Sequence, residues 1–588
     1  MLQSQFKIKS KINSKLQINK FKLITSNQQL QSQNFKSTVS NQKLIQKNSN
    51  PTPNGKNQTR LNPIKLNIQI KRSRCQEMLA IIKSMSLIGI EGYLVDIEVD
   101  VSAGIPSWEI VGLPDISVKE SKERVRTAIR NSGYDMQSRK IVINLAPADI
   151  KKEGPFFDLP IAIGILACMR CINVRNIQNT IFIGELSLDG KINKVNGILP
   201  MCIEAKKLGI KKVILPLENA KEASIVEDIE VIGVNDLEQT VDYINEKNII
   251  SAAKTNLSTL LENNNNYQLD FSDVKGQENI KRALEIAAAG GHNCLLIGTP
   301  GSGKTMMAKR IPSILPDLSF DEALETTKIH SVAGKIDKDC SLIINRPFRS
   351  PHHTISTVSL IGGGRIPKPG EISLAHNGVL FLDELPEFNK NTLEVLRGPL
   401  EDKMVTISRV NASITYPCNF MFVASMNPCP CGFFGSQENE CTCSPQAISR
   451  YMGKISGPLL DRIDIQVEVT PVKYQKLDSN EKIETSKDIK DRVNKARMVQ
   501  QMRYVDENIY SNSQLTPQLI EKYCRLNKEG RKLLEIAFNN LGLSARAYGR
   551  ILKVARTIAD LDNKKDIETS HIAEAIQYRS LDKKYWRN

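Results

Sequence analysis

The spacing of hydrophobic and polar positions predicts alternating strands and helices from about residue 78 onward. Residues 95–101 alternate apolar and acidic side chains, which is typical of a strand with one buried face. Residues 117–131 have helical composition, and the small apolar residues 159–167 indicate a buried helix. Further strands are expected at residues 140–145, 180–184 and 212–215.

Shifts in composition divide the chain into five segments. The first is a basic, acid-free tail, and the third is a polar linker that contains a run of Asn. The second and fourth alternate strand-like and helix-like stretches, whereas the last has a helical pattern rich in Lys, Arg, Glu and Leu. The expected boundaries are 1–77, 78–250, 251–268, 269–475 and 476–588.

One stretch in the fourth segment matches the phosphate-loop pattern G-x-x-x-x-G-K-[ST]. It follows an apolar strand at residues 294–297 and opens a helical stretch at 306–310, which is the context that the pattern requires. Backbone N–H groups of such a loop converge on phosphates, Lys304 would neutralise them, and Thr305 would bind Mg²⁺. The residues of the loop are Gly298, Thr299, Pro300, Gly301, Ser302, Gly303, Lys304 and Thr305.

Two further apolar strands end in polar side chains. Asp383 and Glu384 follow the strand at residues 379–382, and Asn427 ends the stretch 420–427. At the carboxyl end of a buried strand, Asp383 would hold Mg²⁺ and Glu384 would polarise the attacking water. Asn427 would position that water or contact the γ-phosphate, although it could also be a turn residue before Pro428.

The charge of the chain is concentrated in the tail. The net charge is +16, of which residues 1–75 contribute 12 Lys and 3 Arg without an acidic residue. Three interpretations of the tail stay open: an arm that contacts polyanions, a transit peptide, or an untranslated extension with Met78 as the true start. We favour the last, because folded-looking sequence begins abruptly there. The basic balance is therefore weak evidence for nucleic-acid binding by the rest of the chain.

Composition also limits the class of protein. No apolar run reaches the roughly 18–20 residues that a membrane-spanning helix needs, so we expect no membrane partner and a cytoplasmic location. Twelve cysteines in 588 residues is ordinary usage and does not indicate a secreted disulfide framework.

Four of the cysteines are clustered as two C-x-C pairs separated by nine residues: Cys429, Cys431, Cys441 and Cys443. Four thiolates suit a tetrahedral, structural Zn²⁺ site, although C-x-C is tighter than the usual C-x-x-C. Free thiols or a redox pair are the alternatives. A catalytic metal is not expected, because four Cys ligands leave no open position.

The order of phosphate loop, DE pair and Asn is that of an AAA+ core, and four stretches make the likeness closer. The stretches are RPFRSPHHT (346–354), GGG (362–364), PGEISLAHNG (369–378) and NPCPCG (427–432). With them, the chain resembles the magnesium-chelatase-related AAA+ ATPases of the YifB/ComM group from Met78 to near the C-terminus. The resemblance implies a central AAA+ P-loop α/β domain, a C-terminal helical lid, bound ATP and Mg²⁺, and a homo-hexameric ring.

Several site residues are assigned only through this resemblance. In GPLLDRID (457–464), Arg462 resembles the arginine supplied in trans to a neighbour's ATP site, although it could instead pair with Asp461 or Asp464. In SARAYGRILKVAR (544–556), Arg546 is similar to the second sensor, with Arg550 as the fallback. In FSDVKGQ (271–277), Gly276 and Gln277 resemble the stretch beside the adenine.

The resemblance also implies surfaces that face a central pore. Residues 335–377 form a long Gly-, Pro- and His-rich insert, and residues 405–416 predict a hairpin with Arg409 and Asn411 near its turn. Basic tips in a pore would follow a phosphate backbone, although an ordinary solvated hairpin is the alternative. His352 and His353 are adjacent and would point different ways, so joint metal binding is not expected.

Residues 78–250 resemble the α+β domain of ribosomal-protein-S5-like fold found in Lon proteases. The marks are NLAPADIKKEGP (144–155) and IGELSLDG (183–190). Lon-type proteases use a Ser–Lys dyad, but Phe156 and Leu199 stand where the serine and lysine would be expected. We therefore expect a domain without protease activity, in which Lys151 and Lys152 either contact nucleic acid or lie in a solvated loop.

Three functions follow from these expectations. The first is an ATP-hydrolysing ring motor that acts on DNA, single-stranded or branched, in branch migration or a helicase-like role in recombination or transformation. The alternative is a chelatase-like ATPase that remodels a protein complex. The third, an ATP-dependent protease, is disfavoured by the missing dyad. The ATPase assignment rests on residues of this sequence, whereas the DNA assignment rests mainly on resemblance.

Overall fold

The computed structural model describes residues 79–136, 139–256, 267–337, 340–364, 367–409, 412–436, 439–472, 483–507 and 509–586. The predicted tail with Met78, most of the predicted linker, and the expected boundary at 476 lie outside the described residues. Residues 76–588 form one compact unit, and all elements below belong to it. Among the described residues, no helix combines the length and the apolar character that crossing a membrane would require.

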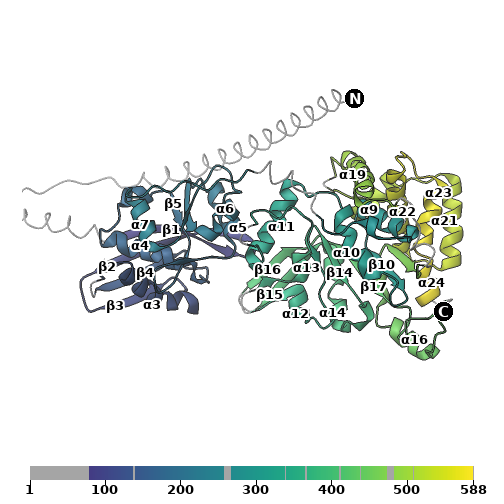
Figure 1. Cartoon of the computed structure of the whole chain (residues 1–588), viewed down its shortest axis with the longest axis horizontal. Coiled ribbons are helices and arrows are strands. Elements are labelled where there is room, and N and C mark those ends of the chain that lie inside the picture. The colour runs from purple at the N-terminus through teal and green to yellow at the C-terminus, as the bar shows by residue number, and fades with distance from the viewer. Residues whose placement is uncertain are drawn as a thin grey trace, which may run out of the picture. The chain divides into compact units, whose positions relative to one another are not determined.

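A seven-stranded mixed sheet organises the first half of this unit (Figure 1). Its order is β3-β4-β2-β1-β5-β8-β9, with antiparallel pairing of β1 with β2 and of β2 with β4, and parallel pairing elsewhere. The predicted alternation is confirmed in β2, where Val95, Ile97 and Val99 are buried. The strands are β1 (Leu79–Ile88), β2 (Glu91–Ser102), β3 (Ser107–Val111), β4 (Lys140–Ala146), β5 (Thr180–Phe182), β8 (Lys212–Pro216) and β9 (Glu230–Val234).

Helix α4 (Asp158–Cys168) forms the centre of the first core. Ten of its eleven residues are buried, because it packs on β1 and β2 and also on α3 (Ile116–Asn131). A Cβ at Gly164 would lie 2.5 Å from Val99 Cγ2, so glycine allows the helix to approach the sheet closely. The other helices of this half are α5 (Ile198–Lys207), α6 (Ala220–Ala223) and α7 (Leu237–Ile244).

The positions of the Lon-type dyad lie in this core. Phe156 and Leu199 are both buried and apolar, so neither offers a nucleophile or a base. Lys152 is also buried, and its Nζ donates a hydrogen bond to the Ile150 carbonyl over 2.7 Å. Both interpretations, nucleic-acid contact and solvated loop, are therefore wrong for Lys152, whose side chain lies inside the fold. Lys151 is exposed and forms an ion pair with Glu153 over 2.8 Å, so its interpretation stays a prediction.

A five-stranded sheet organises the second half (Figure 1). Its order is β11-β14-β17-β10-β18, and every neighbouring pair is parallel. The carboxyl ends of the strands therefore meet at one edge, where open α/β sheets bind ligands. The strands are β10 (Cys294–Gly298), β11 (Phe348–Arg349), β14 (Val379–Leu382), β17 (Met421–Met426) and β18 (Ile465–Val469).

The predicted hairpin is present as an antiparallel pair, β15 (Met404–Arg409) and β16 (Ala412–Pro417). Arg409 is exposed at the end of β15, whereas Asn411 lies outside the described residues. The insert before β14 contains α12 (Thr357–Ile361), the short pair β12 (Gly362–Gly363) and β13 (Lys368–Pro369), and α13 (Glu371–Leu374).

Helices α9 (Glu278–Gly290) and α10 (Lys304–Ile314) cover the second sheet, and the C-terminal helices pack on α9 (Figure 1). Residues of β10, α9 and α22 share one hydrophobic core, so the C-terminal helices are joined to the sheet. The C-terminal helices are α19 (Ser486–Arg503), α20 (Pro517–Tyr523), α21 (Lys528–Leu541), α22 (Ala545–Leu561), α23 (Thr569–Gln577) and α24 (Leu581–Trp586).

One helix connects the two sheets. Helix α11 (Phe320–Ala333) follows the helix of the phosphate loop, yet its Ala323 belongs to the core of the first half. Near its end, the Ser331 hydroxyl donates to the buried carboxylate of Glu222, which also accepts from the Leu199 N–H over 3.2 Å. Burial raises the pKa of Glu222. This polar contact was not predicted, because its partners are far apart in the sequence.

Candidate functional site

The phosphate loop connects β10 to α10 at the carboxyl edge of the parallel sheet. Gly301 and Gly303 adopt positive φ angles of 76° and 92°, which favour glycine. A Cβ at Gly298 would lie 2.2 Å from the Val469 carbonyl oxygen of the neighbouring strand β18, so no larger residue fits there. The glycines thus shape a loop whose backbone leads directly into the N-terminus of α10.

Lys304 fixes the inner side of this loop. Its Nζ donates to the carbonyl oxygens of Gly298 at 2.7 Å and Thr299 at 2.8 Å, and to Asn427 Oδ1 at 3.1 Å. Burial lowers the pKa of Lys304. In the described part of the chain, the buried Thr299 hydroxyl has no hydrogen-bond partner. A half-buried cation beside an unpaired hydroxyl fits a loop that receives phosphate oxygens.

Asp383 lies against the loop from the end of β14. Its Oδ2 accepts a hydrogen bond from Thr305 Oγ1 over 2.6 Å, and its Oδ1 accepts from the Glu384 N–H over 3.0 Å and from the Ser425 hydroxyl. The hydroxyl and the carboxylate are oxygen ligands of the kind that Mg²⁺ takes. Sequence reasoning missed Ser425, although one polar residue within an otherwise apolar strand was the available signal.

Gln277 approaches the loop from the start of α9. Gln277 and Gly276 adopt positive φ angles of 65° and 67°. The Gln277 side-chain amide donates to the Thr470 carbonyl over 2.6 Å and reaches the Ser302 carbonyl at 3.5 Å. The side chain thus connects α9 to the loop, and the expected contact with adenine stays a prediction.

Arg462 is held within its own chain. Its guanidinium donates to the carbonyls of Arg397 at 2.9 Å and Pro458 at 2.8 Å, and forms an ion pair with Glu401. The alternative interpretation, that Arg462 forms an ion pair within its own chain, is therefore confirmed. The predicted partners, Asp461 and Asp464, are wrong, because the guanidinium pairs with Glu401. The trans role of Arg462 stays a prediction.

The two candidate lid arginines have different surroundings. Arg550 forms an ion pair with the buried Asp464, whereas Arg546 is exposed in the first turn of α22. Burial alone would raise the pKa of Asp464. The charge of Arg550 and the contact with His292 outweigh burial, so the pKa of Asp464 lies well below its usual range. Arg550 therefore has a structural partner, and Arg546 remains the candidate sensor.

This difference predicts opposite phenotypes. Arg550→Ala should lower the free energy of unfolding by about 2–3 kcal/mol, because it removes the guanidinium partner of the buried Asp464 carboxylate, which then keeps only its contacts with His292 and the Asn293 N–H. Arg546→Ala should leave that free energy within about 0.5 kcal/mol, as exposed residues do. Chemical denaturation of both variants measures the difference, and equal stability of the two would contradict the structural assignment of Arg550.

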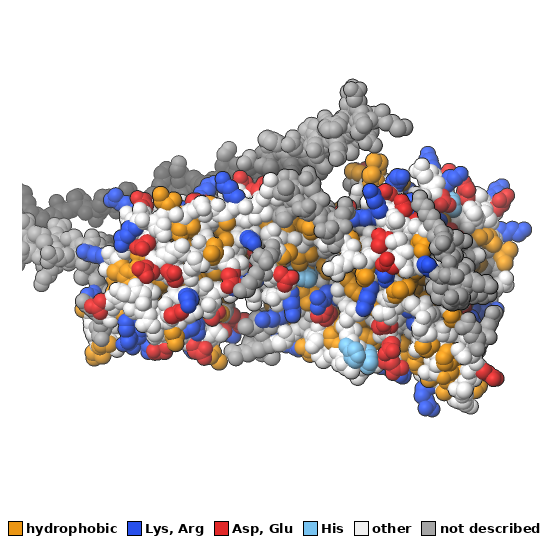
Figure 2. All heavy atoms as spheres, in the orientation of Figure 1, with side chains coloured by type: hydrophobic (Ala, Val, Ile, Leu, Met, Phe, Trp, Pro, Cys, Tyr) orange, Lys and Arg blue, Asp and Glu red, His pale blue; other side chains and the backbone are white. Residues whose placement is uncertain are grey.

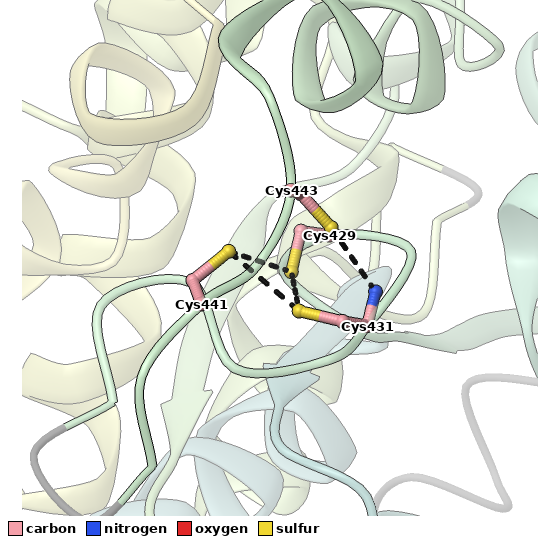
Figure 3. Close-up of side chains that lie close together, drawn as sticks. All are labelled: Cys429, Cys431, Cys441 and Cys443. Carbon is pink, nitrogen blue, oxygen red and sulfur yellow. Dashed lines mark hydrogen bonds between the residues drawn. The ribbon is translucent and has the colours of Figure 1, made fainter.

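The four clustered cysteines converge at the loop that follows β17 (Figure 3). The Sγ of Cys429 lies 3.3 Å from that of Cys431 and 3.7 Å from that of Cys441, and the Cys431 N–H donates to Cys443 Sγ over 3.4 Å. All four Sγ atoms lie within 4.8 Å of one another. Tetrahedral Zn–S bonds of about 2.3 Å require sulfurs about 3.8 Å apart, so the cluster is compatible with structural zinc.

The loop that carries the cysteines is connected to the phosphate loop. Gly432 has a φ of 89°, and a Cβ there would lie 2.5 Å from Pro300 Cδ. The cysteine loop therefore packs directly against the phosphate loop.

The structure brings together the phosphate loop, Asp383 and Asn427, as the sequence predicts. It pairs Arg462 with Glu401 and leaves Arg546 exposed in the first turn of α22. The roles of all these residues stay predictions.

Three sequence families match the chain. Residues 97–219 match subunit ChlI of Mg-chelatase, residues 270–477 match magnesium chelatase, subunit ChlI, and residues 483–579 match the ChlI C-terminal family. Competence protein ComM of Haemophilus influenzae is 43% identical over 505 residues, which cover 86% of this chain and 98% of ComM. YifB of Escherichia coli, an uncharacterized protein, is 43% identical over 511 residues with the same coverage.

A further relative, matched over only part of its length, is similar to the N-terminal region of the chain. Lon protease 2 of Bacillus subtilis is 33% identical over 171 residues, which cover 26% of this chain and 30% of the protease. This similarity supports a Lon-like N-terminal region, and the parallel sheet with its phosphate loop fits an AAA+ α/β core. With nearly the full length of ComM and YifB matched, the chain belongs to the YifB/ComM family of magnesium-chelatase-like AAA+ proteins.

Proposed function

We propose that this protein hydrolyses ATP at the carboxyl edge of the parallel sheet. The observation that carries the proposal is the contact between Thr305 and Asp383, because it joins the phosphate loop to the carboxylate that follows β14. Bound Mg-ATP would supply the phosphoryl group to be transferred to water. The chain supplies a glycine-rich loop, a helix N-terminus and Lys304 for the phosphates, and the oxygens of Thr305 and Asp383 for Mg²⁺.

The other site residues have separate roles in this proposal. Glu384 accepts a proton from the attacking water, and Asn427 orients that water from the end of β17. Arg546 reaches the phosphates from the lid, and Arg462 leaves Glu401 to enter the ATP site of a neighbouring subunit. That last role requires a ring of identical subunits, for which we propose a homo-hexamer.

We further propose that the motor acts on DNA, single-stranded or branched. The support is the family relationship with competence protein ComM and the exposed Arg409 at the end of the β15–β16 hairpin. On the face shown in Figure 2, Lys and Arg side chains are interspersed with Asp and Glu, without one continuous basic surface. We therefore propose that DNA is contacted by the basic hairpin end, which follows the phosphate backbone, and not by a broad basic patch.

The test measures the ATPase rate with single-stranded DNA, with branched DNA and without DNA. A DNA motor is supported if DNA stimulates the ATPase rate and if Arg409→Ala weakens that stimulation. Indifference to DNA, combined with stimulation by a protein partner, supports the alternative of a chelatase-like ATPase that remodels a protein complex. This alternative is supported by the match of residues 270–477 to the magnesium chelatase family.

We propose that the four-cysteine cluster binds one structural Zn²⁺. Cys441→Ser/Cys443→Ser should lose the bound zinc, because two of the four thiolates are removed. It should also raise KM for ATP, because Gly432 in the same loop packs on Pro300. Zinc content by mass spectrometry and ATPase kinetics measure the two effects.

A matched control for zinc is Cys171→Ser, a partly exposed thiol in the first half of the unit. This variant should keep the same zinc content as the unchanged protein. A double variant that retained full zinc would contradict the site. A zinc-free variant with an unchanged KM would contradict the connection to the phosphate loop.

A further inference from the structure

Ser425 brings a hydroxyl group into an otherwise apolar strand. All six residues of β17 are buried, and Ser425 has no exposed surface. The register pairs it with Leu296 of β10, and pairs the preceding Ala424 with Leu382 of β14. Because a buried hydroxyl needs a hydrogen-bond partner, this position puts a donor directly beside the residue that follows Leu382.

The partner of this hydroxyl is Asp383. Ser425 Oγ donates to Asp383 Oδ1, which also accepts from the Glu384 N–H over 3.0 Å. The other carboxylate oxygen, Oδ2, accepts from Thr305 Oγ1 over 2.6 Å. The two oxygens of Asp383 therefore have different environments: two donors hold one of them, and the second faces the hydroxyl at the end of the phosphate loop.

The two donors limit the rotation of the carboxylate. The terminal torsion of an Asp side chain is broad, so the carboxylate turns readily when nothing holds it. With Oδ1 held by the Ser425 hydroxyl and the Glu384 N–H, Oδ2 stays beside Thr305 Oγ1. A carboxylate oxygen and a hydroxyl oxygen next to one another are ligands of the kind that Mg²⁺ takes.

A carboxylate without this restraint has a second attraction. Burial lowers the pKa of Lys304, and the negative charge of Asp383 opposes that effect, so the two groups act on each other. An ion pair between them would occupy a metal ligand and a phosphate ligand at once. The hydrogen bond from Ser425 favours the arrangement in which both groups stay available.

We propose that Ser425 is a positioning residue that holds Asp383 Oδ2 next to Thr305 Oγ1, in the arrangement that binds Mg²⁺. The inference rests on the proposed ATPase function of the same site. Ser425 acts through Asp383, as hydrogen-bond partners of metal ligands do, and loss of such a partner costs about 10–100-fold in metal affinity.

The test measures how nucleotide binding by the full chain depends on Mg²⁺, with a fluorescent, non-hydrolysable ATP analogue. Ser425→Ala should raise the Mg²⁺ concentration for half-maximal enhancement of binding at least about tenfold. In EDTA the variant should bind the analogue as the unchanged protein does, because the loop backbone and Lys304 bind the phosphates. ATPase kinetics should show the same separation, with kcat restored at high Mg²⁺.

Two further variants separate positioning from a structural role. Ser313→Ala is the matched control, since it removes a buried hydroxyl whose partners are the Arg310 carbonyl and the Ser486 hydroxyl. This variant should keep the Mg²⁺ dependence of the unchanged protein. In the Asp383→Asn background, Ser425→Ala should change the Mg²⁺ dependence by less than about twofold, because its effect acts through the missing carboxylate.

Three results would overturn the inference. The first is an unchanged Mg²⁺ dependence of Ser425→Ala. The second is equal weakening of binding with Mg²⁺ and in EDTA, which would indicate a general effect on the fold. The third is a further tenfold loss when Ser425→Ala is added to Asp383→Asn.

The same measurements distinguish the two proposals. If the unchanged protein neither binds the analogue more tightly with Mg²⁺ nor hydrolyses ATP, the proposed function fails, and the inference fails with it. Mg²⁺-dependent hydrolysis by the unchanged protein, together with the same Mg²⁺ dependence in Ser425→Ala, would reject the inference alone.

Discussion

Glu384→Gln is expected to bind ATP with unchanged affinity and to lower kcat at least about 100-fold. A general base contributes about 10²–10⁴ to a rate, and an amide of the same shape cannot accept the proton from water. The side chain is 58% exposed, so neither folding nor the phosphate loop depends on its charge. Equilibrium binding of a fluorescent ATP analogue and a phosphate-release assay measure the two effects.

The matched control is Glu387→Gln, three residues further along the chain. Glu387 is also partly exposed, and its carboxylate pairs with Lys454 at 3.4 Å, away from the phosphate loop. This variant should keep both binding and turnover. Rapid ATP hydrolysis by the Glu384 variant would show that another group activates the water.

Much of the second half of the unit was predictable, because its signals are local. The apolar runs of β10, β14 and β17 read as buried parallel strands, and the glycines before Lys304 indicate a loop with positive φ angles. Once the strands are parallel, their polar ends must meet at one edge. The approach of Asp383 to Thr305 follows from that topology and from two local patterns.

Partners joined through the tertiary fold could not be predicted. Arg462 pairs with Glu401 and Arg550 with Asp464, each through a fold that brings distant segments together. For Arg462 the sequence pattern offered two nearby acids, Asp461 and Asp464, but could not indicate Glu401. Ser425 was missed for the same reason, since its hydroxyl has meaning only beside Asp383.

The cysteine loop shows a further limit of sequence reasoning. The C-x-C spacing indicates a metal site but not what the site stabilises. In the structure, the packing of Gly432 on Pro300 and the edge-to-face contact of Phe434 with Tyr585 place this loop between the phosphate loop and α24. A structural metal there would fix one wall of the phosphate loop, which is why its removal should affect ATP binding.

Lys304→Ala is expected to weaken ATP binding about 100-fold or more and thereby to remove hydrolysis at moderate ATP concentrations. Hydrogen bonds from a cation to charged phosphate oxygens are each worth about 1.5–3 kcal/mol, so two of them account for this loss. Folding should not suffer, because burial lowers the pKa of Lys304 and its charge is therefore poorly solvated in the nucleotide-free protein.

Lys309→Ala is the matched control, because Lys309 is exposed on the same helix, α10. It should bind ATP as the unchanged protein does. Titration calorimetry with both variants separates loss of the Lys304 cation from a general change in charge. Together with Glu384→Gln, the Lys304 variant separates binding from chemistry: one loses affinity, and the other loses only turnover. Unchanged affinity of the Lys304 variant would mean that the loop between β10 and α10 does not hold the phosphates, and the proposed function would fail at its first step.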